Sequence, residues 1–395
     1  MRHISWGIAI VTVLGCGAES WVTQPPAARR VQSSSEVRYV VDTLPTLGGR
    51  LSRPSGINND GWLAGFSTLP GDTIRHAALW RDGAVTDLLT LGGQNSNVQW
   101  PGISSSAIIA GISEIAELDT LGEEWSCTAF FPRLTGQRCR GFVWEDGVMT
   151  AMPTLGGDQG FAAGVNSRGQ VVGWAETPVV DPTCNAPQVL QFRAVLWEPR
   201  KGTMRQLPPF PGDSTSASTA INEKGVAVGI SGDCDIAVGQ RSARRSVIWE
   251  NGVVREIGNL GGDFWHTPMD INERGDVVGF SNPSGVIGID FRPHGFLWTR
   301  GGGIQDLGTL RDDLTSQAVG INDRGQIVGV SSGPGGNRAF LWEDGVMKDL
   351  NGLVGSFPHR LIVAQHINDA GVITGRAVVQ GTTRQVPFVA TPIEP

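Results

Sequence analysis

The segment that decides the fold is GINDRGQIVGVSSGPGGNRAFLWEDGVMKDL, residues 320–350. Its first half returns as GVNSRGQVVGWA from residue 164, AINEKGVAVGIS from residue 220 and DINERGDVVGFS from residue 270. Aligning the Ile-Asn pair extends the series to seven copies, which lie 46 to 62 residues apart along the chain. The aligned pairs are residues 57–58, 103–104, 165–166, 221–222, 271–272, 321–322 and 367–368. Repeats of this length are typical of propellers and solenoids.

Each copy is expected to form four short strands joined by tight turns. In INDRGQIVG the turn is a hairpin in which Gly325 can adopt a positive φ at no steric cost. The third strand carries consecutive apolar residues, as in AFLW, which predicts burial on both faces. It ends in a tryptophan in six copies: Trp80, Trp144, Trp197, Trp249, Trp298 and Trp342. Because no copy has a helical apolar period, we predict an all-β fold, a seven-bladed β-propeller of four-stranded antiparallel blades.

The two ends of the repeat region predict how the ring closes. The seventh copy supplies three strands before the chain reaches Pro395. The missing fourth strand is present at the other end, in RYVVDTLPTL at residues 38–47. We predict that this N-terminal strand completes the last blade, because closure removes strand edges that would otherwise invite aggregation.

The first 37 residues have the composition of an export signal and a tether. Arg2 precedes an apolar run that is too short to span a bilayer, and the run ends in VLGC, which resembles a bacterial lipobox. The resemblance implies that residues 1–16 are a lipoprotein-type signal peptide and that Cys16 is lipidated. Residues 17–37 predict a flexible tether ahead of the propeller at residues 38–395. We expect an exported protein held at the outer membrane or cell surface; the alternative is an ordinary cleaved signal and secretion.

The repeat also resembles a known family. The patterns TLGG, INxxGxVVG and AFLWxxGxMxDL are similar to the HAF repeat of predicted extracellular bacterial proteins, over nearly all of residues 38–395. Copy two departs from the pattern at GISSSAIIAG, and copy seven has Phe388 in place of the tryptophan. The resemblance implies an extracellular, propeller-like protein, and it brings no established catalytic residues.

Composition and motifs limit the partners. The net charge of −7 argues against a nucleic-acid partner, since a phosphate-binding surface normally carries a basic excess. The sequence has no HExxH, no phosphate-binding loop and no zinc-ligand spacing. GVSSG at residues 329–333 lacks the strand-to-helix context of a catalytic serine. We therefore expect no cofactor, no metal and a monomeric ring whose contact with a membrane is limited to a lipid anchor.

All the length variation falls on one end of the ring. The Asn-x-x-Gly and Trp-x-x-Gly hairpins stay short and share one end, here called the hairpin face. Insertions at about residues 114–139, 175–192, 231–244 and 281–293 share the opposite end, the insert face. Variable loops on a rigid scaffold are the usual place for binding sites. We predict a binding rim there that includes Trp100, Trp125, Trp265 and His266; the alternative is that these residues cover loop cores or plug the channel.

Four cysteines lie in these insertions, and four cysteines in a secreted chain allow three pairings. Cys127 and Cys139 share one insertion, whereas Cys184 and Cys234 occupy equivalent insertions of neighbouring blades. We predict disulfides between Cys127 and Cys139 and between Cys184 and Cys234. A metal site is the alternative, although neither a Cys-x-x-Cys spacing nor a nearby histidine favours it.

Two polar positions repeat with the fold and are interpreted as structural. The paired asparagine is expected to shape its hairpin: Asn58, Asn166, Asn222, Asn272, Asn322 and Asn368. A basic residue precedes each third-strand Trp or Phe by four positions, and we expect it to pair with backbone carbonyls or fourth-strand acids rather than with an anionic glycan. These residues are His76, Arg140, Arg193, Arg245, His294, Arg338 and Arg384. SEIAELDTLGEE at residues 113–124 is interpreted as a solvated loop, with a calcium site as the alternative.

These observations favour a non-catalytic surface protein that binds a glycan or a protein through the insert face. The alternative is a propeller lyase or hydrolase of polysaccharides, with an active site at the channel mouth built from residues such as His266 and His359. A third alternative is a structural scaffold of the cell envelope. We recognise no catalytic constellation, so we expect no enzymatic activity.

Overall fold

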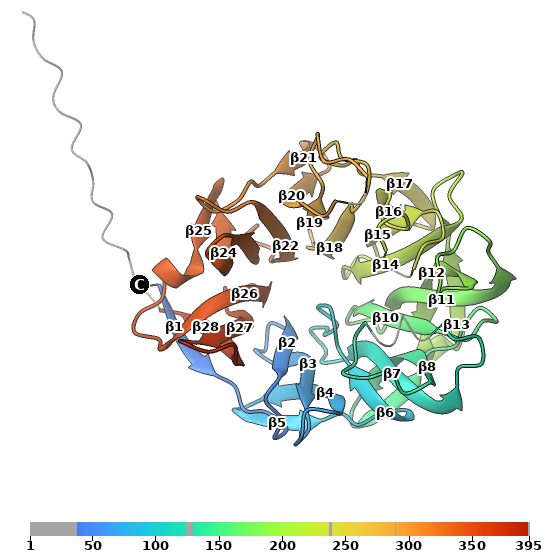
Figure 1. Ribbon diagram of the computed structural model, residues 1–395, viewed down its shortest axis with the longest axis horizontal. Helices are drawn as coiled ribbons and strands as arrows, with labels where there is room; N and C mark the ends of the chain where they lie inside the picture. The colour runs from blue at the N-terminus through green and yellow to red at the C-terminus, as the bar shows by residue number, and fades with distance from the viewer. Residues whose placement is uncertain (1–37, 124–128, 237–238, 289, 394–395) are drawn as a thin grey trace, which may run out of the picture. The chain divides into compact units, whose positions relative to one another are not determined.

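The computed structural model describes residues 38–123, 129–236, 239–288 and 290–393; Cys16, Trp125 and Cys127 lie outside these ranges. Within them the chain forms seven four-stranded antiparallel sheets, arranged as blades around a central axis (Figure 1). Six blades follow the order of the chain, and the last combines β1 with β26, β27 and β28. The predicted seven-bladed β-propeller is confirmed.

The blades have the following strands. The first is β2 (Ser52–Ile57), β3 (Leu63–Thr68), β4 (Arg75–Arg81) and β5 (Ala84–Asp87); the second is β6 (Gly92–Asn97), β7 (Ile109–Leu118), β8 (Gln137–Glu145) and β9 (Val148–Ala151). The third is β10 (Gly160–Val165), β11 (Val171–Val180), β12 (Leu190–Glu198) and β13 (Thr203–Leu207); the fourth is β14 (Thr215–Ile221), β15 (Ala227–Gly232), β16 (Arg245–Glu250) and β17 (Val253–Glu256). The fifth is β18 (Thr267–Ile271), β19 (Val277–Ser281), β20 (His294–Thr299) and β21 (Gly303–Asp306); the sixth is β22 (Thr315–Ile321), β23 (Ile327–Gly333), β24 (Gly336–Glu343) and β25 (Val346–Asp349). The seventh is β26 (His359–Ile367), β27 (Ile373–Val379), β28 (Gln385–Pro392) and β1 (Tyr39–Thr43).

The only helices in the described ranges are two short 3-10 turns, η1 (Pro199–Lys201) and η2 (Leu350–Gly352). No helix there is long and apolar enough to cross a membrane.

The ring closes through the N-terminal strand, as predicted. β1 pairs with β28 from Tyr39 opposite Pro392 to Thr43 opposite Phe388. Tyr39 is buried, and its neighbour Arg38 forms an ion pair with Glu343 of blade 6. Strand pairing and this ion pair together tie the start of the propeller to two blades.

Within each blade, the strands become more exposed with increasing distance from the axis of the ring. In Figure 1, β2, β10, β14, β18, β22 and β26 lie nearest the centre of the ring. Second strands such as LAGFST of β3 are buried throughout because neighbouring blades cover both faces. The outermost strands alternate exposed and half-buried residues, as in AVTD of β5. The repeated tryptophan lies on the third strand of its blade; Trp80 is almost fully buried and donates from Nε1 to the carbonyl of Pro45 (2.8 Å).

A chain of hydrogen bonds joins the blades on the hairpin face. The side-chain oxygen of Asn222 accepts the N–H groups of Lys224 (3.1 Å) and Val226 (3.0 Å), and its amide donates to the carbonyl of Asn272 (3.0 Å). The same inter-blade bond runs from Asn58 to Ser104, Asn166 to Asn222, Asn272 to Asn322, Asn322 to Asn368 and Asn368 to Asn58. Ser104 has no amide to continue the chain. The asparagine shapes its turn, as predicted, and also links neighbouring blades, which we did not predict.

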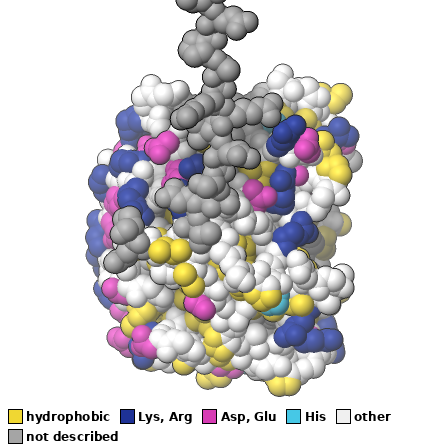
Figure 2. Space-filling view, turned by 90° about the vertical axis from the view of Figure 1, so that its left-hand side faces the viewer, with side chains coloured by type: hydrophobic (Ala, Val, Ile, Leu, Met, Phe, Trp, Pro, Cys, Tyr) yellow, Lys and Arg dark blue, Asp and Glu magenta, His cyan; other side chains and the backbone are white. Residues whose placement is uncertain are grey.

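The insertions contain more strand than predicted. β11 runs to Val180 and β12 begins at Leu190, so much of residues 175–192 is a lengthened hairpin rather than a loop. The pairing continues because Glu176 lies opposite Phe192 and, after a bulge, Val180 lies opposite Leu190. These lengthened hairpins raise the wall of the insert face. On the side of the ring in Figure 2, acidic and basic side chains are interspersed among uncharged ones.

Candidate functional site

Two cavities lie on the axis of the ring, one toward each face. The insert-side cavity has a volume of about 330 Å³, and its polar lining residues are Arg53, Gln99, Thr267, Gln317, Asn337, Gln365 and Arg376. The hairpin-side cavity has a volume of about 170 Å³ and is lined by the ends of the inner strands. Of the two, the insert-side cavity reaches the roughly 300–1,000 Å³ typical of ligand pockets.

Carboxylates surround the hairpin-side cavity, and the backbone of the neighbouring blade holds each of them. The Glu223 carboxylate accepts the N–H of Ser167 (2.8 Å), and that of Glu273 accepts the N–H of Glu223 (2.6 Å). In the same way, the Asp323 carboxylate accepts the N–H of Glu273 (2.8 Å), and that of Asp369 accepts the N–H of Asp323 (2.8 Å). Burial raises the pKa of Glu273, and the charges of Asp323 and Glu223 add to the rise. This mouth of the axis is therefore negatively charged.

His366 and Asp270 meet across the axis in the hairpin-side cavity. His366 Nε2 lies 3.2 Å from Asp270 Oδ2, and His366 Nδ1 lies 3.1 Å from the backbone nitrogen of Ile57. With its proton on Nε2, the ring donates to Asp270 and accepts from Ile57. Asp270 also accepts the N–H of Ile321 (2.9 Å). Both ring nitrogens are engaged, and the imidazole links blade 7 to blades 1 and 5.

The insert-side cavity combines an aromatic ring with amide groups. Trp100 lines this cavity and packs edge-on against Phe161, with ring centroids 4.7 Å apart, which fixes the indole at the wall. Gln365 lines the same cavity, and its buried side-chain oxygen has no hydrogen-bond partner among the described residues. An aromatic face beside amide groups can stack on a sugar ring and hydrogen-bond its hydroxyl groups.

Three arginines gather beside this cavity. Arg53 and Arg376 line it, while the guanidinium carbons of Arg75 and Arg53 lie 4.0 Å and 5.4 Å from the ring centroid of Phe66. Burial lowers the pKa of Arg376 and of Arg53. Burial also lowers the pKa of Arg75 to about 10, and repulsion from Arg376 adds to the fall for Arg75 and Arg53. The cavity thus carries a concentrated positive charge.

Trp265, another tryptophan of the predicted rim, does not line this cavity. Trp265 packs edge-on against Phe291, with ring centroids 5.1 Å apart, at the insertion of blade 5. Trp125 lies outside the described residues. The structure therefore brings Trp100, of the predicted set, together with the arginines and amides of the axis.

His266, which we predicted on the exposed rim, is fully buried, and this part of the prediction is corrected. Its ring nitrogens lie 2.8 Å from Ser281 Oγ and 3.1 Å from the carbonyl oxygen of Gly262. Burial lowers its pKa to about 4, so the ring is neutral at neutral pH. The cause is the turn before β18, which folds the histidine back onto β19 and gives it a structural role. His359 packs instead on Phe357, with ring centroids 5.2 Å apart.

The disulfide between Cys184 and Cys234 joins the insertions of blades 3 and 4, as predicted. Cys139 is also disulfide-bonded, and its predicted partner, Cys127, lies outside the described residues. Asp181 lies close to the two paired sulfurs, but a disulfide does not offer the thiolates that a metal site uses. These cysteines pack in the same apolar cluster as Trp100, so the disulfide supports one wall of the cavity.

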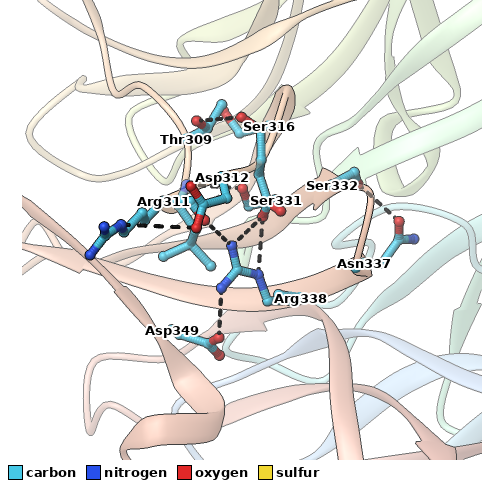
Figure 3. A network of polar contacts seen from close by, with 12 residues as sticks. Thr309, Arg311, Asp312, Ser316, Ser331, Ser332, Asn337, Arg338 and Asp349 are labelled. Carbon is cyan, nitrogen blue, oxygen red and sulfur yellow. Dashed lines mark hydrogen bonds and ion pairs between the residues drawn. The ribbon is translucent and has the colours of Figure 1, made fainter.

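The repeated basic residues pair within the scaffold. Arg338 contacts Asp349 (3.3 Å) and Asp313 (3.0 Å) and donates to the carbonyl of Arg311 (2.6 Å) (Figure 3). The expected pairing with a fourth-strand acid forms in four blades: His76–Asp87, Arg245–Glu256, His294–Asp306 and Arg338–Asp349. In the same region Ser331 of GVSSG is buried and accepts the N–H of Leu310 (3.0 Å), so it is not an exposed nucleophile. The structural interpretation is confirmed for these four pairs.

Two acids that we interpreted as solvated are buried instead. Glu123 accepts the N–H groups of Val189 (2.6 Å) and Leu190 in the next blade. Glu114 accepts the N–H of Asn95 (2.8 Å). The solvated-loop interpretation is wrong for both residues, because each carboxylate satisfies backbone donors that strand pairing leaves free.

Position-by-position comparison of the seven copies identifies three site residues that the sequence analysis did not single out. The residue after the second-strand glycine is apolar in six copies: Phe66, Ile112, Trp174, Ile230, Phe280 and Val330. Arg376 takes that position in copy seven. Two residues before the aligned Asn or Ser, five copies have Gly or Ala, whereas Asp270 and His366 stand there in copies five and seven. Blade geometry does not require these departures, which makes them candidates for function.

No family model and no curated protein matches the chain. Among solved structures, the β-propeller domain of the Trilobed protease from Pyrococcus furiosus is similar, with a TM-score of 0.52 and 10% identity over 87% of this chain and 98% of that chain. Oligogalacturonate lyase in complex with manganese has a TM-score of 0.52 and 10% identity, over 90% and 97% of the two chains. Virginiamycin B lyase from Staphylococcus aureus has a TM-score of 0.50 and 10% identity, over 90% and 100%. At these identities the similarity shows the propeller fold alone.

Proposed function

We propose that this protein is an exported binding protein that holds an oligosaccharide in the insert-side cavity. The observation that carries the proposal is the lining of this cavity, which includes the indole of Trp100 and the amides of Gln317, Asn337 and Gln365. Sugars present both apolar faces and hydroxyl groups, so they stack on aromatic rings and pair with amides. A closed ring orders little on binding, which favours affinity.

Export and tethering through Cys16 belong to the same proposal. The disulfide between Cys184 and Cys234 supports an oxidising compartment outside the cytosol. Labelling of expressing cells with an alkyne fatty acid tests the anchor. We expect the wild-type protein to be labelled and the Cys16→Ser variant not to be; labelling of neither would exclude a lipid anchor.

A broad glycan array with the purified protein tests the binding function. We expect a defined set of oligosaccharides to bind, and Trp100→Ala to weaken their binding at least tenfold. Trp265→Ala is the matched control, because this tryptophan belongs to the insert face and packs on Phe291 rather than on the cavity wall. Circular dichroism checks that both variants fold. A blank array, or a loss that follows Trp265 instead of Trp100, would reject binding in this cavity.

A polysaccharide lyase or hydrolase is the second candidate. One observation favours it, the His366–Asp270 pair on the wall of the hairpin-side cavity. A histidine oriented by a carboxylate is a common general base, although here the second ring nitrogen faces Ile57. Incubation with the array-positive glycans, followed by chromatography, tests this candidate. It requires fragments that appear with the wild-type protein and disappear with a folded His366→Ala variant.

A further inference from the structure

We propose that the insert-side cavity selects an acidic oligosaccharide, whose carboxylate is held between the guanidinium groups of Arg53 and Arg376. The inference rests on the proposed function, since it names the chemical class of ligand for the same cavity. The two guanidinium groups line this cavity, and their hydrogen-bond partners are neutral groups rather than carboxylates.

The hydrogen-bond partners of these two arginines are neutral. Arg53 donates from Nε to Ser55 Oγ (3.3 Å) and from Nη2 to the carbonyl oxygen of Gln99. Arg376 donates from Nη1 to Oε1 of Gln385 (2.8 Å). The buried Nε of Arg376 has no partner in the part of the chain that the structure describes. The two guanidinium groups therefore retain N–H donors that a planar carboxylate can accept.

A third arginine increases the positive charge behind the cavity. Arg75 donates to the carbonyl oxygen of Phe130, and its guanidinium group lies over Phe66 beside that of Arg53. The charges acting on Arg53 are those of Arg376 and Arg75, and both repel it. A buried charge without an opposite charge destabilises a fold, and a bound anion would offset that cost.

The positive charge of the insert-side cavity does not follow from the repeat, because neither the other cavity nor the equivalent positions of the other copies carry it. The hairpin-side cavity carries the carboxylates of Glu223, Glu273, Asp323 and Asp369, which repel an anion. At the position of Arg376 the other copies have apolar residues, and at the position of Arg53 they have Gln99, Phe161, Ala217, Thr267, Gln317 and Val363. Neither arginine is required by the blade. Both enter the same cavity, where a sugar carboxylate would meet them while its ring stacks on Trp100.

Isothermal titration calorimetry with three probes of equal length tests this inference. The probes are a uronate oligosaccharide, a carrageenan-derived oligosaccharide that carries sulfates but no carboxylates, and a neutral cello-oligosaccharide. The variants are Arg376→Ile, which copies the isoleucine of two other repeats, and Arg376→Lys, which keeps the charge but loses the planar fork. Arg311→Gln is the matched control, because Arg311 is also on the insert face and its side chain is 93% exposed.

We expect the wild-type protein to bind the uronate probe at least tenfold more tightly than the neutral one. Arg376→Ile should weaken uronate binding at least tenfold and change neutral binding less than twofold, Arg376→Lys should be intermediate, and Arg311→Gln should match the wild type. Equal affinity for acidic and neutral probes overturns the inference while the proposed function stands. A preference for the sulfated probe overturns the assignment to a carboxylate. Binding of no oligosaccharide at all overturns both proposals.

Discussion

His366 Nε2 lies 3.2 Å from Asp270 Oδ2, although 96 residues separate the two in the chain. The pair spans copy six, where Gly320 leaves room for it: an added Cβ would come within 3.0 Å of the His366 backbone and ring. Because the other copies carry Gly or Ala at these positions, the axis accommodates two larger side chains only together with small neighbours. The pair belongs to the lining of the hairpin-side cavity.

A double-mutant cycle measures that relationship. We expect His366→Ala and Asp270→Ala each to lower the free energy of unfolding by about 2 kcal/mol, since each removes the acceptor of a backbone N–H, from Ile57 and Ile321 respectively. The double variant should lose about 1 kcal/mol less than the sum, as residues in contact do. Urea denaturation provides the three values. Strictly additive losses would show that the two side chains act separately.

Replacement of Arg376 by isoleucine should stabilise the ligand-free protein. The change removes a half-buried charge, whose Nε is buried without a partner among the described residues, from a position that is apolar in six copies. We expect the free energy of unfolding to rise by about 1–3 kcal/mol. Arg311→Gln should stay within about 0.5 kcal/mol of the wild type, as exposed substitutions do. Urea denaturation in the absence of glycan compares them. A destabilised Arg376→Ile variant would mean that the arginine serves the fold.

Two variants of Asn272 separate the turn from the inter-blade bond. Asn272→Ser resembles copy two, where Ser104 Oγ accepts the N–H of Ile108 (3.1 Å). It should keep a turn acceptor but lose the amide donor, which bonds the carbonyl of Asn322 in the next blade (3.2 Å) and the carboxylate of Asp276 (3.2 Å), at a cost of about 1 kcal/mol. Asn272→Ala removes the turn acceptor as well and should cost about 2–3 kcal/mol. Chemical denaturation measures both. If the serine variant were as stable as the wild type, the hydrogen-bond chain around the axis would contribute nothing.

Removal of the disulfide between Cys184 and Cys234 should weaken both the fold and binding. The crosslink joins residues separated by 50 positions, so Cys184→Ala/Cys234→Ala should lower the free energy of unfolding by about 3–4 kcal/mol. Since these cysteines share an apolar cluster with Trp100, glycan affinity should fall as well. Denaturation and calorimetry of the double variant measure the two effects. An unchanged glycan affinity would show that the wall supported by this disulfide is not part of the binding site.

A buried carboxyl pair gives the stability a pH dependence. Glu176 and Glu123 both contact the amide nitrogen of Gln188, at 2.8 Å and 3.3 Å. Burial and the charge of Glu123 raise the pKa of Glu176 to about 8. Between its ordinary carboxyl pKa and 8, the folded state holds a proton that the unfolded state has released, so the contribution of this group to stability falls as the pH rises through that window.

Glu176→Gln should remove this contribution. We expect the stability difference between variant and wild type to shift in favour of the variant from pH 5 to pH 9, as followed by urea denaturation at each pH. A difference that stays constant across this range would contradict the raised pKa.

The sequence predicts the ring well because the repeat encodes local geometry. Seven copies, the strand at residues 38–47 and the hairpin turns follow from periodicity, and the pairing of Tyr39 with Pro392 confirms the closure. The cysteine pairing of Cys184 with Cys234 also follows, because equivalent insertions of adjacent blades must be neighbours.

The site was harder to predict because it depends on which side chains reach the axis. Trp100 was identified as an aromatic residue in a variable region, yet its neighbours Arg53 and Arg376 come from blades 1 and 7 and carried no motif of their own. Burial also reversed local expectation: Glu123 and His266 belong to polar segments and are fully buried by contacts that form only in the closed ring. Comparing the copies position by position would have found Arg376, since it is the one charged residue after the second-strand glycine.

A crystal structure of the protein with the acidic oligosaccharide that binds best tests the central claim most directly. We predict a sugar in the insert-side cavity, stacked on Trp100, with its carboxylate within hydrogen-bonding distance of Arg53 and Arg376. A sugar bound at the outer loops near Trp265, or in the hairpin-side cavity beside His366, would contradict the account.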